Sequence, residues 1–252
     1  MIERDQLATY VHELLACATF EDYAPNGLQI EGRHAIRRIA TAVTASKEAI
    51  SEAIAFQADA LLVHHGYFWR GEATVITGMK RERIGKLMAQ DMSLFAYHLP
   101  LDCHLALGNN ACLGRLLSIE TIQTHSVNKT ANLLWSGSFA KPIAANAFAR
   151  EIETKLGRKP LLVSGSVKPI ERIAWCSGGA QDFIEEASHL GVDAYLSGEI
   201  SERTYYQAQE LQLHYFAAGH HATERFGIQA LGHHLADQFA LDHLFIDSAN
   251  PV

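Results

Sequence analysis

DALLVHHGYFWR, residues Asp59 to Arg70, is the stretch that decides the fold of this chain. Its apolar residues lead into the adjacent pair His64 and His65 and stop at Gly66, which predicts a buried strand with two imidazoles at its carboxyl end. Neighbouring side chains on a regular strand point to opposite faces, so we expect each ring to serve one of two neighbouring metal ions. The alternative is a core histidine beside a loop histidine.

The residues on both sides of this stretch predict alternating strands and helices. An amphipathic helix over 4–19 opens the chain, and a strand over 36–43 follows it. Ser46 is suited to cap a helix over 47–58 that leads into the histidine strand. A helix over 81–90, a strand over 93–98 and a helix over 109–117 continue the pattern, so the first part of the chain is predicted to be α/β.

The second part of the chain predicts the same kind of structure. Strands are expected over 172–176, 193–198, 213–219 and 243–247, with helices over 182–190 and 202–211 and a helix running through Leu231. Residues 118–170 give a weaker pattern, with a strand candidate over 132–139 and a helix between Pro142 and Gly157. We interpret this middle part as a connection with structure of its own.

An internal repeat links the two parts. Residues 38–65 align without a gap on residues 172–199, which predicts an internal duplication. The identical pairs are Arg38/Arg172, Ile39/Ile173, Ala40/Ala174, Ile50/Ile184, Glu52/Glu186, Ala53/Ala187, Asp59/Asp193, Ala60/Ala194 and Leu62/Leu196. The second copy has Gly198 and Glu199 where the first has the two histidines. We expect Glu199 to be dispensable for metal binding, because its half already contributes a carboxylate at Glu224.

Composition limits the possible functions. The chain has 252 residues, a hydrophobic fraction of 48% and a formal net charge of -7, which is typical of a globular protein and makes binding of nucleic acid by the whole surface unlikely. Its four cysteines form no CxxC pair, which favours a reducing compartment and argues against a thiolate zinc site. The charged start and the lack of a long apolar run predict a cytoplasmic protein.

Four further residues join the histidine pair as candidates. His98 closes a predicted strand and is followed by Asp102, while His220 follows another strand and precedes Glu224 by four residues. Ligands gather beyond the carboxyl ends of strands in open α/β sheets. The spacing of His220 and Glu224 puts both side chains on one face of a helix, whereas Pro100 favours a loop between His98 and Asp102.

This set of imidazoles and carboxylates is typical of hydrolytic sites with two metal ions. Zn, Mn and Fe bind such donors, and a zinc site with an open position takes only three protein ligands, so two ions with a bridging carboxylate are favoured. His98 is then a candidate base or a residue that orients other groups. The alternative is that these residues are helix caps and satisfied core histidines.

Some signals are weaker. The first set contains histidines that more often orient ligands or face solvent: His104, His221, His233 and His234. The second contains basic residues that could hold a phosphate or form a solvated helix face: Arg70, Lys80, Arg81 and Arg83. Ser177-Gly178-Gly179 after a strand is similar to a phosphate-cradling turn but lacks the full glycine pattern.

Four longer motifs resemble a known family. DYAPNGLQIEG, VHHGYFWRGE, HLPLDCHLALGNN and AGHHATERFGI are similar to those of the NIF-three-like family, whose members are named GTP cyclohydrolase type-two homologs. The resemblance implies two similar, intertwined three-layer α/β/α domains and a toroidal hexamer with its sites facing an internal cavity. The family's metal ligands fall on His64, His65, Asp102, His220 and Glu224, with Glu224 as the bridge. Cys103 is not part of the pattern.

We therefore expect two lobes and one metal cluster. The first lobe covers 1–125 and carries His64, His65 and Asp102; the second covers 126–252 and carries His220 and Glu224, with its C-terminal part able to pack on the first. The predicted function is that of a dinuclear hydrolase using Fe, Mn, Zn or Mg on a nucleotide-like or heterocyclic small molecule. The alternative is a ring-shaped metal-binding, metal-delivery or interaction scaffold without catalysis.

Overall fold

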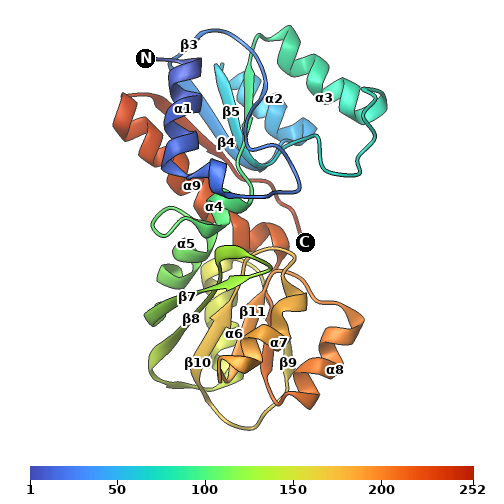
Figure 1. The fold of residues 1–252 in the computed structure, drawn as a ribbon, viewed down its shortest axis with the longest axis vertical. Helices are drawn as coiled ribbons and strands as arrows, with labels where there is room; N and C mark the ends of the chain where they lie inside the picture. Colours follow the sequence, from blue (N-terminus) through green and yellow to red (C-terminus); the bar gives the residue numbers. More distant parts are fainter. The chain divides into compact units, whose positions relative to one another are not determined.

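The computed structural model describes residues 1–252 and divides them into two compact α/β units (Figure 1). Unit 1 comprises Met1–Leu101 and Gly227–Ala249, and unit 2 comprises Asp102–Phe226 and Asn250–Val252. The division differs from the predicted boundary between residues 125 and 126. The C-terminal residues 227–249 belong to unit 1.

Unit 1 is built on a five-stranded sheet in the order β13-β4-β5-β6-β2. The strands β4 (Arg38–Thr44), β5 (Ala60–His65), β6 (Ser93–Ala96) and β13 (Asp242–Ile246) are parallel, and β2 (Gly27–Ile30) is antiparallel to β6. A separate pair, β1 (Ile2–Glu3) and β3 (Ala35–Ile36), lies outside this sheet. The parallel strands direct their carboxyl ends, where the candidate histidines lie, to one edge of the sheet.

Helices cover both faces of the unit 1 sheet (Figure 1). On one face α2 (Lys47–Ala55) and α3 (Gly78–Ala89) pack against Ala40, Leu61 and Leu94 of the strands. On the other lie α1 (Arg4–Leu14) and the C-terminal part of α9 (His220–Phe239). Ser46 caps α2 as predicted, because its side chain accepts a hydrogen bond of 3.0 Å from Ala49 N.

Unit 2 is built on a six-stranded sheet in the order β7-β8-β10-β11-β12-β9. Its parallel centre consists of β10 (Ile170–Trp175), β11 (Ala194–Ser197) and β12 (His214–Ala217), and the antiparallel strands are β7 (Glu120–Val127), β8 (Thr130–Ile143) and β9 (Leu161–Ser164). Residues 118–170, interpreted as a connection, thus supply three strands of the sheet.

Four α-helices lie within unit 2: α5 (Asn109–Leu116), α6 (Ala145–Leu156), α7 (Ile184–His189) and α8 (Glu202–Glu210). Each unit also has a short 3-10 helix, η1 (Cys17–Thr19) in unit 1 and η2 (Gln181–Phe183) in unit 2. α6 ends at Gly157, as predicted, where φ is 71°. Its Phe148 and Ile152 pack with Trp175 and Phe216 in the core on one face of the sheet.

The two sheets share a strand register that follows the sequence repeat. In unit 1, β4 pairs with β5 at Ile39 and Ala60; in unit 2, β10 pairs with β11 at the aligned residues Ile173 and Ala194. A second feature recurs at the aspartates of the repeat. Asp59 accepts hydrogen bonds from the backbone amides just before and at the start of β4, and Asp193 accepts two from the equivalent amides within β10. The repeat therefore corresponds to a shared local architecture.

Candidate metal centre

Three imidazoles gather at the carboxyl edge of the unit 1 sheet. His64 and His65 end β5, and His98 follows β6. The ring centroid of His64 lies 4.6 Å from that of His65 and 5.1 Å from that of His98, and one ring nitrogen from each of the three lies within 4.8 Å of the others. Although neighbours on a strand are expected to diverge, these two rings lie close enough to face one ion.

Hydrogen bonds orient His64 by its Nδ1 atom. Nδ1 of His64 lies 2.9 Å from the carbonyl oxygen of Tyr97, which can only accept, so this nitrogen carries the proton and donates. Nε2 then carries the lone pair that a metal ion requires. His65 is in contact with Thr44 through Nδ1 at 3.3 Å, and a hydroxyl can serve as donor or acceptor there.

Asp22 fixes His98 in the same way, and sequence reasoning did not single it out. The carboxylate of Asp22 accepts from Asn26 Nδ2 at 2.9 Å and from the backbone amides of Tyr23 and Leu99 at 2.6 and 2.9 Å. Nδ1 of His98 is a fourth group on this carboxylate at 2.8 Å and must also donate. Burial raises the pKa of Asp22, but the interactions with His98 and Asn26 outweigh burial and leave this pKa below its ordinary value.

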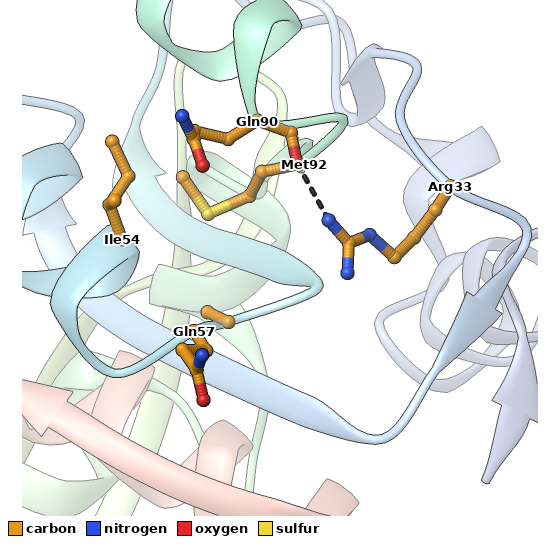
Figure 2. A pocket seen from close by; sticks show the side chains of 6 residues that line it. Arg33, Ile54, Gln57, Gln90 and Met92 are labelled. Atoms are coloured by element: carbon orange, nitrogen blue, oxygen red, sulfur yellow. Dashed lines mark hydrogen bonds between the residues drawn. The ribbon is translucent and has the colours of Figure 1, made fainter.

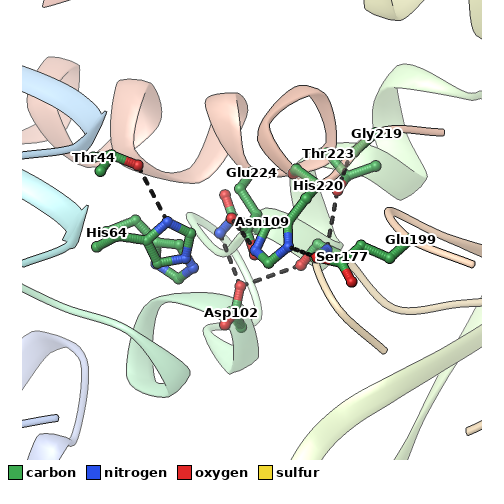
Figure 3. A network of polar contacts seen from close by, with 12 residues as sticks. Thr44, His64, Asp102, Asn109, Ser177, Glu199, Gly219, His220, Thr223 and Glu224 are labelled. Atoms are coloured by element: carbon green, nitrogen blue, oxygen red, sulfur yellow. Dashed lines mark hydrogen bonds and ion pairs between the residues drawn. The ribbon is translucent and has the colours of Figure 1, made fainter. Parts of the chain in front are cut away.

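Unit 2 holds a buried carboxylate at Asp102. Oδ1 of Asp102 accepts from Asn109 Nδ2 at 2.8 Å and from Ser177 Oγ at 3.2 Å, and Figure 3 shows both side chains directed at it. Pro100 was expected to place Asp102 in a loop. Instead Asp102 lies in α4 (Leu99–Cys103), a short helix that tolerates Pro100 because a first turn needs no donor from that nitrogen.

His220 and Glu224 lie on the first turn of α9, as their spacing predicts. Nε2 of His220 is 3.2 Å from Oε2 of Glu224, and Nδ1 of His220 is 2.6 Å from Oε1 of Glu199 (Figure 3). A proton on Nδ1 satisfies Glu199, which leaves the Nε2 lone pair facing a carboxylate oxygen. Two facing acceptors require a proton or a metal cation, so this pair fits a metal ion.

The electrostatics of His220 agree with that geometry. Burial lowers the pKa of His220, but hydrogen bonds and charges from Glu224 and Glu199 outweigh burial and raise it to about 9. The site thus attracts positive charge. Glu199, expected to be dispensable, orients a candidate ligand.

The turn that follows β10 surrounds this pair but is not a phosphate cradle. Gly178 has a φ of +67°, and a Cβ atom there would collide with Oε1 of Glu224 and lie 3.2 Å from Nε2 of His220. The amides of this turn are used within the protein: Ser177 N donates to Asn110, Gly178 N to Thr223 and Ala180 N to Ser197. The glycine therefore makes room beside the candidate ligands.

Most of the weaker candidates have local roles. Nδ1 of His104 accepts from the amide of Leu107 at 2.9 Å, and His234 is hydrogen-bonded to Tyr10 at 2.7 Å. His233 packs edge-on against His243. Lys80 donates to Glu72 at 3.3 Å and so orders the loop after β5 rather than holding a phosphate.

A hollow of about 230 Å³ lies away from these groups in unit 1 (Figure 2). It is lined by residues next to the amino ends of β5 and β6, among them Ala58 and Met92, whereas the histidines follow the carboxyl ends. Arg33 at its rim donates to the carbonyl of Gln90 and to Asp59. It contains no candidate ligand.

Residues 2–251 match the Duf34/NIF3 (NGG1p interacting factor 3) family, and the chain belongs to it. It is 50% identical over 249 residues to a protein of Pseudomonas aeruginosa and 49% identical over 249 residues to one of Yersinia pestis, each match covering 98% of both chains. Both relatives are called GTP cyclohydrolase 1 type 2 homolog.

Solved structures agree with the assignment. The structure of protein ybgI, described as of unknown function, superimposes with a TM-score of 0.95 at 46% identity over all of both chains. TTHA1606 from Thermus thermophilus gives 0.90 at 30% identity, again over all of both chains. None of the helices has the length and apolar character needed to cross a membrane.

Proposed function

We propose that this protein is a dinuclear metal-dependent hydrolase of a nucleotide-like or heterocyclic small molecule. The proposed ligands of its two divalent ions, drawn from Fe, Mn, Zn or Mg, are His64, His65, Asp102, His220 and Glu224, with Glu224 as the bridge. The observation that carries the proposal is the contact of His220 Nε2 with Glu224 Oε2 at 3.2 Å, where a metal ion could replace the shared proton.

The course of the chain supports a set drawn from both units. The chain passes from unit 1 to unit 2 within α4, between Leu101 and Asp102, and returns within α9, between Phe226 and Gly227. Asp102 is therefore the first residue after the crossing in α4, and Glu224 lies just before the crossing in α9. The histidine pair belongs to unit 1, and the other three proposed ligands belong to unit 2.

The residues around the proposed ligands suit hydrolysis. Two bound divalent ions supply an activated water and stabilise developing negative charge on the substrate. Asn109 and Ser177 hold Asp102, and Glu199 holds His220, so these donors need little reorganisation. His98, fixed by Asp22, can accept a proton at Nε2 as a base or orient a reacting group.

The proposed substrate class comes from the relatives' names and from this chemistry. A cyclohydrolase opens a heterocyclic ring with an activated water and a proton relay, which this set of residues can provide. We also propose a cytoplasmic toroidal homohexamer that does not bind nucleic acid. Light scattering of the purified protein would test the hexamer.

Metal analysis followed by a substrate screen tests the function. We expect two ions per chain after reconstitution with single divalent metals, and metal-dependent turnover in a panel of nucleotides, damaged bases and cyclic amides. Asp102→Ala should abolish turnover, and Asp182→Ala, which removes an exposed carboxylate of unit 2, should retain it. One ion or none under all conditions would refute the dinuclear site. Full occupancy without turnover would favour the scaffold alternative.

A further inference from the structure

We infer that Arg158 of unit 2 binds a phosphate group of the substrate, which narrows the substrate class to phosphorylated, nucleotide-like molecules. The inference rests on the proposed function, because it gives that reaction a specificity-determining residue. The proposed metal ligands and the carboxylates that orient them are negative or neutral, so a positively charged side chain adds a kind of contact that they do not supply.

The sheet topology of unit 2 places Arg158 at the edge that carries candidate ligands. Arg158 follows α6 and precedes β9, whose first residue, Leu161, pairs with Ala217 at the carboxyl end of β12. His220 follows that same strand end. Ligands of open α/β sheets bind beyond the carboxyl ends of the parallel strands. Arg158 therefore lies at the edge of unit 2 where a substrate of this site is expected.

The guanidinium group of Arg158 lies against the turn that leads into His220. Gly219, the residue before His220, has a φ of +103°, and a Cβ atom there would collide with Nη1 of Arg158 and lie 2.9 Å from its Cδ. Figure 3 shows Gly219 beside the first turn of α9, next to His220. Glycine avoids both the backbone strain and the collision. The absent side chain thus leaves the space in which the guanidinium is held beside a candidate ligand.

The charge of Arg158 is not matched by a carboxylate of the protein. Its Nη1 atom is buried and has no hydrogen-bond partner, while the side chain as a whole is half-buried. Arg33 and Arg203, by contrast, are held in ion pairs with aspartates. A buried donor without a partner is costly, and more so when it is charged, so an anion that accepts from this group is favoured. The planar guanidinium presents paired donors that match the oxygens of a phosphate.

The carboxylates near His220 set the conditions for anion binding. Glu199 and Glu224 both lie within 3.2 Å of this ring and repel an anion. Divalent ions offset that negative charge when they are bound. We therefore expect phosphate to bind more tightly to the metal-loaded protein than to the chelator-treated protein, with Arg158 contributing in both forms.

Binding of inorganic phosphate tests the role of Arg158. Calorimetry measures the affinity of the full chain for phosphate, both loaded with a divalent metal and treated with a chelator. We expect Arg158→Gln to weaken phosphate binding about 10–100-fold in both forms, because a hydrogen bond from a charged donor is lost. Arg158→Lys keeps the charge but not the paired donors, so its affinity should be intermediate. Lys159→Gln, which removes the neighbouring exposed charge, is the matched control and should bind phosphate as the wild type does.

Nucleotide probes test the specificity. We expect the metal-loaded wild type to bind guanosine 5′-monophosphate more tightly than guanosine, and Arg158→Gln to lose most of that preference. Metal content and circular dichroism of Arg158→Gln should match those of the wild type. A residue that only packed against Gly219 would instead lower metal binding, because its removal would shift His220.

The outcomes separate this inference from the proposed function. Equal phosphate affinities in the wild type and Arg158→Gln, or a loss of metal together with phosphate, would overturn the inference and leave the dinuclear hydrolase standing. Phosphate binding that depends on Arg158, without metal-dependent turnover of any substrate, would support the anion site and refute the proposed function.

Discussion

Two carboxylates outside the predicted ligand set hold imidazoles by their Nδ1 atoms. Glu199 lies 2.6 Å from His220 and Asp22 lies 2.8 Å from His98. Such a contact fixes the protonated nitrogen and turns the other toward a ligand. At the scale of single residues, the site therefore depends on side chains that need not touch a metal ion.

The role of Glu199 gives a direct prediction. Glu199→Gln keeps an oxygen that can accept from His220 but removes the charge, so we expect metal binding to weaken about 10–100-fold while the fold is retained. Competition with a chelator measures the affinity, and circular dichroism checks the fold. Glu202→Gln, which alters an exposed carboxylate in the first turn of α8, is the matched control. Equal affinities in Glu199→Gln and the wild type would restore the expectation that Glu199 is dispensable.

The sequence indicated the candidate ligands but not the carboxylates that contact them, for a physical reason. His64 lies at the end of a strand, and Glu224 shares a helical face with His220. Both patterns can be recognised from neighbouring residues in the sequence. Asp22 reaches His98 from 76 residues away through a turn with no periodic pattern. Glu199 was compared with His65 through the repeat, and that comparison hid its contact with His220.

At the scale of elements, strands with a buried apolar pattern and capped helices were predictable. β4, α2 and β5 occur where the sequence placed them, and Gly157 ends α6. The short helix α4 was missed because Pro100 disfavours a helix interior but is accepted in a first turn. The units divide inside α4 and α9, where no turn residues mark a boundary in the sequence.

The contact of β13 with β4 and α9 predicts a pH dependence of stability. Burial, with a smaller contribution from the charge of His233, lowers the pKa of His243 to about 4, and its ring is hydrogen-bonded to Thr41. The folded state thus resists protonation of His243 that the unfolded state accepts near pH 6.5. This stability is present above that pH and is lost as the pH falls toward 4.

Urea unfolding at pH 7 and pH 4.5 measures this effect. A shift of one pKa unit corresponds to about 1.4 kcal/mol. Because His243 is partly exposed and solvent screens its interactions, we expect it to account for only about 1–2 kcal/mol of the wild-type loss. His243→Gln should lose correspondingly less stability between the two pH values. The same loss in both proteins would show that His243 does not titrate as its surroundings imply.

At the scale of the whole molecule, metal binding is coupled to folding, because an ion that binds only the folded chain stabilises it. The stabilisation is about 2.7 kcal/mol when the concentration of the ion is 100 times its dissociation constant. The chain carries reporters for each unit, since Trp69 lies in unit 1 and the remaining tryptophans, Trp135 and Trp175, lie in unit 2. We therefore expect metal to raise the thermal unfolding midpoint that is measured by the tryptophan fluorescence of each unit.

In Trp69→Phe, only the tryptophans of unit 2 contribute to the fluorescence. The difference between the wild-type fluorescence and that of this variant gives the contribution of unit 1. Glu224→Ala should lose at least one ion and all activity while keeping its fold, because it removes the proposed bridge between two close cations. Its metal-dependent shift of the unfolding midpoint should then be smaller than that of the wild type. A shift in unit 1 alone for the wild type would contradict the proposed ligand set, since Asp102, His220 and Glu224 belong to unit 2.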